Sequence, residues 1–258
     1  MNRLYLAILS ALIFVGCNRT PNQVSDNFSS TKYLFSSYIN SCTGGVISVG
    51  SDIRLKLAKS VSDSITNIPL SEDIFSFSPA IDGNISWGDN KTVIFQPSNK
   101  LKSNQQYEVT VNLKPLVTGI EDDKRQFKFM FQTLMQNFEV DVAGIKLYNA
   151  TDLEKVKVEG RLQTADIVNF DDVKRALEAT QRGNELTVNW SLGIDNTFHF
   201  IVEDVARTEA ESEVELRVDG EVLSIDKSEE LEVVIPSISD YKVLSSRIIR
   251  GEEIFISV

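Results

Sequence analysis

Hydrophobic side chains recur at every second position over much of this sequence. Ile53, Leu55 and Leu57 alternate with Arg54 and Lys56. Successive side chains of a β-strand point to opposite faces, so a period of two predicts strands with one buried face and one solvated face. The same alternation runs through Tyr107, Val109, Val111 and Leu113, and through Phe127, Phe129 and Phe131.

The second half of the chain repeats this period with different residues. In both halves of the chain, turn-forming residues separate the predicted strands, as at Asp82-Gly83 and Asp219-Gly220. Pro79 and Pro97 exclude a continuing central strand at their own positions. Short strands between frequent turns predict an all-β fold of tandem sandwiches. The alternating positions here are Phe138, Val140, Val142, Val156, Val158, Leu162, Leu186, Val188, Trp190, Phe198, Phe200, Val202, Val214, Leu216, Val218, Leu231, Val233 and Ile235.

One segment departs from the period of two. Between Asn169 and Gln181, the side chains of Val173, Ala176, Leu177 and Thr180 follow helical spacing. Acidic residues (Asp171, Asp172) lie near the start of this segment, and Gly183 lies just past its end, which is typical of helix termini. We expect one helix over about 169–181, packed across an open end or edge of the second sandwich.

These patterns divide the chain. We expect a first sandwich over 38–136 and a second over 137–239. A new strand pattern begins at Val243 and continues through Ile248 and Ile249 to the apolar end Ile254–Val258. Because the two cores before it are already complete, we expect 240–258 to be the first strands of a further domain, cut off by the end of the sequence.

The first residues predict export. Arg3 supplies a positive charge, and the run from Leu4 to Val15 is apolar apart from Tyr5 and Ser10. This run is shorter than the ~20 apolar residues that a membrane-spanning helix needs. We therefore expect a signal peptide over 1–17.

The end of this signal peptide resembles a bacterial lipobox. In a lipobox, a small residue precedes a cysteine that is lipidated on sulfur and becomes the first mature residue. The sequence Phe14-Val15-Gly16-Cys17 fits this pattern, although Phe14 stands where leucine is usual. The resemblance implies lipidation of Cys17, and residues 18–37, rich in Ser, Asn and Thr, are then a flexible tether. A plain secretory signal with a chance cysteine is the alternative.

The net charge limits which binding partners are expected, and the cysteine content limits which disulfides can form. The formal net charge is −11, and the basic residues form no stripe, so a nucleic acid partner is not expected. The same charge disfavours docking of the folded domains on anionic lipid, which leaves the lipid on Cys17 as the membrane contact. With Cys42 as the one other cysteine, a disulfide framework is excluded, and Cys42 is expected to be a small buried side chain in the first strand region.

Several segments follow one another in the first sandwich: Phe77-Ser78-Pro79, Asp82-Gly83, Trp87, Val93–Pro97, Leu101 and Tyr107–Val111. Their order resembles the bacterial Ig-like domain of large cell-envelope proteins. In the second block, Leu162–Asp166 with the helix after it, Asn189-Trp190 and His199-Phe200 resemble the second macroglobulin-like domain of bacterial alpha-2-macroglobulins, as does the exit through Tyr241–Leu244.

The resemblance implies a lipid-anchored protease trap of the cell envelope, on the periplasmic face of the inner membrane or on the outer membrane. In this family a protease cuts a bait segment, the domains rearrange, and in many members a thioester captures the protease. A thioester site needs Gln at the third position after Cys, whereas Cys42 is followed by Thr43, Gly44 and Gly45. The resemblance therefore assigns this chain the roles of tether and scaffold, with proteases met by parts of the protein beyond it.

No enzymatic site, cofactor or metal is expected. His199 is the one histidine, and its place between Phe198 and Phe200 points it away from the core that they share. Zinc binding and Ser-His or Cys-His catalysis therefore lack their side chains. Acidic pairs such as Asp122-Asp123, Asp171-Asp172 and Glu229-Glu230 have no calcium-loop spacing and are interpreted as solvated loops and a helix start.

A different class of function remains open. Exposed loops and sheet edges of sandwiches often bind other molecules. The alternative to the inhibitor scaffold is therefore a cell-envelope Ig-like module that binds a surface polysaccharide or a protein partner.

Overall fold

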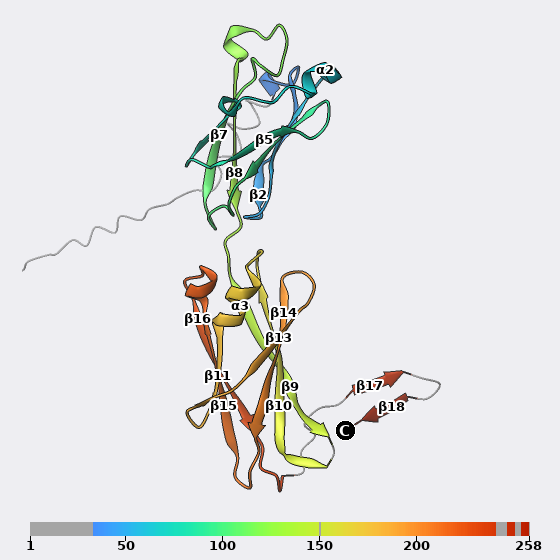
Figure 1. Ribbon diagram of the computed structural model, residues 1–258, viewed down its shortest axis with the longest axis vertical. Coiled ribbons are helices and arrows are strands. Elements are labelled where there is room, and N and C mark those ends of the chain that lie inside the picture. Colours follow the sequence, from blue (N-terminus) through green and yellow to red (C-terminus); the bar gives the residue numbers. More distant parts are fainter. Residues whose placement is uncertain (1–32, 150, 241–246, 251–253, 258) are drawn as a thin grey trace, which may run out of the picture.

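The computed structural model describes residues 33–149, 151–240, 247–250 and 254–257. Their strands form two sandwiches, each made of two four-stranded sheets, and one further strand pair. The sandwiches stand end to end, with the first in blue to green and the second in yellow to red (Figure 1). The predicted all-β class with tandem sandwiches is confirmed.

The first sandwich contains eight strands. One sheet has the order β1-β3-β6-β5 and the other β2-β8-β7-β4. Neighbouring strands are antiparallel except β2 and β8, which run parallel with Gly45 opposite Phe131 and Ile47 opposite Thr133. The strands are β1 (Ile39–Cys42), β2 (Gly45–Ile47), β3 (Ile53–Leu57), β4 (Phe75–Ser78), β5 (Gly83–Trp87), β6 (Thr92–Pro97), β7 (Gln106–Asn112) and β8 (Gln126–Thr133). Short helical turns lie at α2 (Asp63–Thr66), η1 (Glu72–Ile74) and η2 (Asp122–Lys124).

Alternation builds the first core. In β3, Ile53, Leu55 and Leu57 are buried while Arg54 and Lys56 are exposed. β8 repeats this with Phe127, Phe129 and Phe131 inside. The period of two in the sequence is thus the period with which these strands bury their side chains.

The first core begins earlier than the sequence indicates. Phe35 lies within the range assigned to the tether, yet it is buried, and its ring centroid lies 5.2 Å from that of Phe127. The tether assignment over 18–37 therefore extends too far, because the Ser-rich composition hides one aromatic anchor.

The second sandwich also pairs two antiparallel sheets. Their strand orders are β13-β14-β10-β9 and β12-β11-β15-β16. The strands are β9 (Phe138–Asn149), β10 (Asp152–Thr164), β11 (Leu177–Gln181), β12 (Asn184–Glu185), β13 (Val188–Leu192), β14 (Thr197–Ala206), β15 (Ser212–Asp219) and β16 (Ser228–Ile235), with a helical turn η3 (Gly220–Leu223) before β16.

The inserted helix is shorter than expected. Helix α3 spans Phe170–Ala176, and Asn169 caps it by accepting a hydrogen bond from the backbone N–H of Asp171. From Leu177 the chain becomes β11, which pairs with β15, so the predicted range of 169–181 is wrong after Ala176. Leu177 and Thr180 fit helical spacing, but Leu177, Ala179 and Gln181 are buried at every second position. The helix lies at the end of the second sandwich that faces the first (Figure 1).

Near the C-terminus, β17 (Arg247–Arg250) and β18 (Ile254–Ser257) pair antiparallel in a sheet of their own. They lie within the range predicted to begin a further domain. That they belong to a longer third domain stays a prediction.

Candidate functional site

The facing ends of the two sandwiches meet at the side chain of Asp166. This residue follows β10 and is only 2% exposed. Its Oδ1 accepts a hydrogen bond from Ser48 Oγ at 2.6 Å, and its Oδ2 accepts one from the backbone N–H of Val49 at 2.7 Å. One carboxylate of the second sandwich thus binds two adjacent residues of the first.

The connecting segment, residues 134–137, is bound to the same aspartate. Gln136 Nε2 donates to the carbonyl oxygen of Asp166 at 3.0 Å, and Gln136 Oε1 accepts from the N–H of Asp166 at 2.8 Å. The hydroxyl of Thr164 donates to the same carbonyl at 2.7 Å. The backbone polar groups of this buried residue are therefore satisfied, as buried polar groups require.

A groove of about 450 Å³ runs beside this contact. Lys100 and Lys102 of the first sandwich line one side, and Asn169 and Asp172 of the second line the other. Hollows at domain interfaces are common ligand sites, but both lysines are exposed and the groove is open to solvent.

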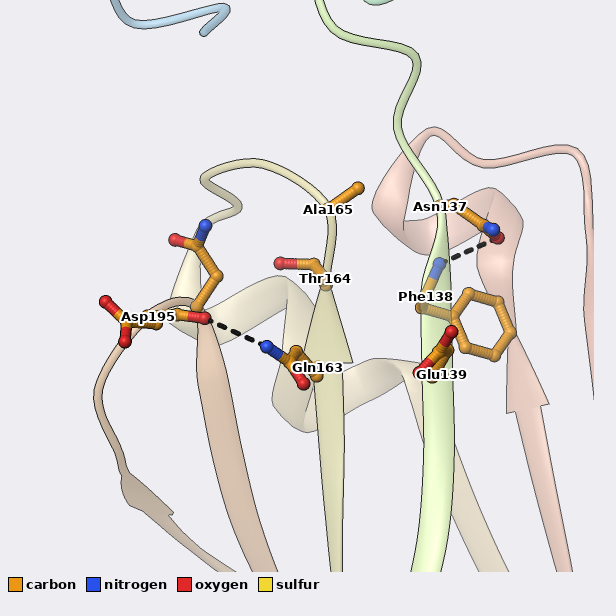
Figure 2. Close-up of a pocket in the computed structure, with 8 residues that line it drawn as sticks. Asn137, Phe138, Glu139, Gln163, Thr164, Ala165 and Asp195 are labelled. Atoms are coloured by element: carbon orange, nitrogen blue, oxygen red, sulfur yellow. Dashed lines mark hydrogen bonds between the residues drawn. The ribbon is translucent and has the colours of Figure 1, made fainter.

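A second hollow, of about 340 Å³, lies at the same end of the second sandwich (Figure 2). Glu139, Gln163 and Asp195 line it, and Gln163 Nε2 donates to the carbonyl oxygen of Asp195 at 3.4 Å. Both carboxylates are exposed. Amide and carboxylate groups of this kind can hydrogen-bond a polar ligand, but they form no pair of a nucleophile and a base.

The structure places the remaining chemically capable residues apart. His199 is exposed on β14, as its position between two buried phenylalanines predicts. Asp122 and Asp123 lie in η2, and Asp171 and Asp172 in the first turn of α3. The ammonium of Lys174, 2.6 Å from Asp171, lowers the pKa of that carboxyl. Among the described residues, no group of three His, Cys, Asp or Glu side chains could hold a metal ion.

Of the two cysteines, Cys17 lies outside the described residues. Cys42 lies at the end of β1, half-buried against the first core. Within the described parts of the chain, no helix has the length and apolar character needed to span a membrane.

Comparison with known proteins adds similarity at low levels only. No family model and no curated protein matches the chain. Among solved structures, L,D-transpeptidase 3 from Mycobacterium tuberculosis is 16% identical over 47% of this chain, with a TM-score of 0.29. The match covers 44% of that structure, so this chain spans less than half of its length.

Two longer matches have similarly low scores. An L,D-transpeptidase from Mycobacterium smegmatis is 11% identical over 76% of this chain and 72% of its own, with a TM-score of 0.27. Bovine butyrophilin is 10% identical over 77% of this chain and 96% of its own, with a TM-score of 0.29. At these values none of the three bears on what this chain does.

Proposed function

We propose that this chain is the tether and scaffold of a lipid-anchored bacterial envelope protein of the alpha-2-macroglobulin type, which traps attacking proteases. The supporting observation is the order of parts: two β-sandwiches that stand end to end (Figure 1) follow a lipobox-like sequence in the chain. Their buried cores have no residue in common. Such a pair extends away from its anchor and presents whatever follows it.

The proposal assigns no catalysis to this chain. The side chains at the facing ends of the sandwiches are amides, carboxylates and exposed lysines. Asp166, the most buried of the ionisable side chains there, accepts hydrogen bonds from Ser48 and Val49 and so binds protein rather than substrate.

Protease capture by the whole protein tests the proposal. The full natural gene product, including anything encoded after Val258, is incubated with a broad-specificity endopeptidase, and size-exclusion chromatography follows the protease activity. We expect the activity to co-elute with the protein. The control is the same protease with its active site blocked, which cannot cut a bait and should elute alone. Failure of the active protease to co-elute would contradict the inhibitor assignment.

The lipid anchor has a separate test. Mass spectrometry of the mature N-terminus is expected to show a peptide that begins at Cys17 and carries acyl groups. The variant Cys17→Ala should lose both the acyl mass and membrane association. A mature peptide that retains residues before Cys17, or an unmodified thiol there, would remove the anchor from the proposal.

A second candidate is an Ig-like module that binds a surface polysaccharide. It is favoured by the hollow of Figure 2, where Glu139, Gln163 and Asp195 offer hydrogen-bonding groups suited to hydroxyl-rich ligands. A glycan array probed with the chain tests it. Glu139→Ala with Gln163→Ala should abolish a signal from this hollow, while Glu178→Ala, on the exposed face of β11, should leave it unchanged. An array without signal would reject this candidate.

A further inference from the structure

We infer that Asp166 is a positioning residue that locks the two sandwiches into one rigid body at a fixed angle. Tandem sandwiches joined by a short connection commonly move relative to each other, unless specific contacts prevent it. The inference concerns the mechanics of this pair and does not depend on protease trapping.

The carboxylate of Asp166 fixes orientation as well as distance. Ser48 Oγ and the N–H of Val49 approach its two different oxygens, so a rotation that preserved one hydrogen bond would break the other. The N–H of Ile167 also donates to Oδ1, at 2.8 Å, which holds the carboxylate in place on its own sandwich. Hydrogen bonds to an ionised acceptor are stronger than those between neutral groups, and two-point contacts of this kind add geometric specificity.

The connecting segment is fixed on both sides and cannot act as a free swivel. On the side of the first sandwich, the N–H of Leu134 donates to the carbonyl of Ile47 at 2.8 Å, and the N–H of Gln136 donates to Ser103 Oγ at 2.7 Å. On the other side, the side chain of Gln136 pairs with the N–H and the carbonyl of Asp166. The connection and the carboxylate therefore hold the same joint.

An apolar contact lies beside these hydrogen bonds at the joint. Gly50, two residues after Ser48, faces the side chain of Ile167, and a Cβ placed on Gly50 would lie 2.4 Å from Ile167 Cδ1. A larger side chain at Gly50 must push Ile167 aside or open the joint.

Distances between spin labels test the lock. Lys56→Cys on β3 and Glu232→Cys on β16 place labels on exposed positions of the two sandwiches. The full chain also carries Cys17→Ala and Cys42→Ser, so that no other thiol reacts. We expect a single narrow distance distribution, which Asp166→Asn broadens because an amide nitrogen cannot accept the hydrogen bonds that one carboxylate oxygen accepts. The matched control, Asp171→Asn at an exposed position of α3, should keep the native width.

A second variant keeps the test decisive if Asp166→Asn impairs folding. Ser48→Ala removes the hydroxyl that donates to Oδ1 of Asp166 and leaves that carboxylate in place, so it is expected to broaden the distribution. A native distribution as broad as that of the variants would overturn the lock. So would a folded Asp166→Asn protein with the native width, or a Ser48→Ala protein with the native width, because that variant has lost the hydroxyl that donates to Oδ1.

Discussion

Gly160 on β10 is a residue for which size alone decides stability. It lies opposite Phe200 on β14, and a Cβ added to it would lie 2.2 Å from Phe200 Cζ and 2.6 Å from the carbonyl oxygen of Asp141. Overpacking of this kind typically costs about 1–3 kcal/mol. We expect Gly160→Ala to lower the urea midpoint accordingly, whereas Gly44→Ala, whose nearest atom lies 3.9 Å away, should change it little. Equal midpoints for both variants would contradict the packing argument.

Tyr148 should ionise well above the usual pKa of a tyrosine in the folded protein. Partial burial raises its pKa to about 12, and so do its hydrogen bond to Glu203 and the negative charges of Glu203 and Asp204. The backbone N–H of Asp204, which donates to the phenol oxygen, acts in the opposite direction. The usual pKa of tyrosine is 10.0, so the folded protein keeps this proton over a range where the unfolded chain releases it.

Tyr148 therefore makes the stability of the folded protein fall at high pH. The contribution of Tyr148 to stability is fully present below the unfolded pKa of 10.0 and is lost as the pH rises toward about 12. An absorbance titration of phenolate should show a late step that Tyr148→Phe removes and Tyr33→Phe leaves in place. A titration of the folded protein without such a step would show that the fold does not help Tyr148 to keep its phenol proton.

At the scale of residues, the lock could not be predicted from the sequence. Asp166 follows a strand, where an aspartate reads as an ordinary turn residue, and its partner Ser48 lies 118 positions away. Strands repeat locally, but a hydrogen bond between domains depends on how two separate sandwiches meet. By contrast, the exposure of His199 followed from its two buried neighbours, because strand alternation is local.

At the scale of elements, α3 and β11 show where pattern reasoning fails. Over Val173–Thr180, helical spacing and strand alternation share positions, so the sequence indicates a helix longer than the one that forms. Pairing decides the boundary, because Leu177–Gln181 completes a ladder with Val214–Val218 of β15. A segment of this length has too few periods to separate the two patterns without its partner strand.

The segment that leaves the second sandwich is held by Arg207. This side chain is 6% exposed, and its guanidinium donates to the carbonyls of Pro236, Ser237 and Asp240 at 2.9, 2.6 and 3.3 Å. The planar group offers donors in several directions, which the single ammonium of a lysine does not. Arg207→Lys should therefore leave some of these carbonyls without their donor, at a cost of about 1–3 kcal/mol.

Hydrogen exchange over residues 236–240 measures this effect. We expect Arg207→Lys to accelerate exchange there, including at the N–H of Ile238, which donates to the carbonyl of Thr208. Arg217→Lys is the matched control, because Arg217 is exposed on β15. Unchanged exchange in Arg207→Lys would show that the exit segment is held by other contacts.

At the scale of the whole molecule, each core should respond to its own mutations. The chain has two tryptophans, and Trp87 packs against the first core while Trp190 packs against the second. Trp190→Phe and Trp87→Phe each leave one fluorescent reporter. Leu55 is fully buried in the first core, and Leu55→Ala should cost about 2–5 kcal/mol.

The stability lost in Leu55→Ala should be reported by the tryptophan of the same core only. We expect Leu55→Ala to lower the urea midpoint reported by Trp87 far more than the midpoint reported by Trp190. Leu216→Ala, in the second core, should do the reverse. Equal shifts of both midpoints would mean that the sandwiches unfold as one cooperative unit.

The architecture was the most predictable part of the molecule. Alternating residues such as Val109 and Val111 on β7, or Val214 and Leu216 on β15, are buried as their spacing predicts. Composition located the start of the first core less well, because Phe35 packs into that core from within a Ser-rich stretch. Fold class follows from many repeated local signals, whereas a segment's end can depend on one side chain.

The parallel pairing of β2 with β8 bears on how the molecule carries tension. β2 directly follows β1, which pairs with β3 in the other sheet, and β8 leads toward the second sandwich, so a pull applied to the chain at the start of β2 and at the far end of the molecule draws β2 and β8 lengthwise past each other. The residue pairs of this parallel ladder, from Gly45 with Phe131 to Ile47 with Thr133, then lie across the line of force and resist it together. In a hairpin pulled at its two free ends, the residue pairs would instead separate one after another.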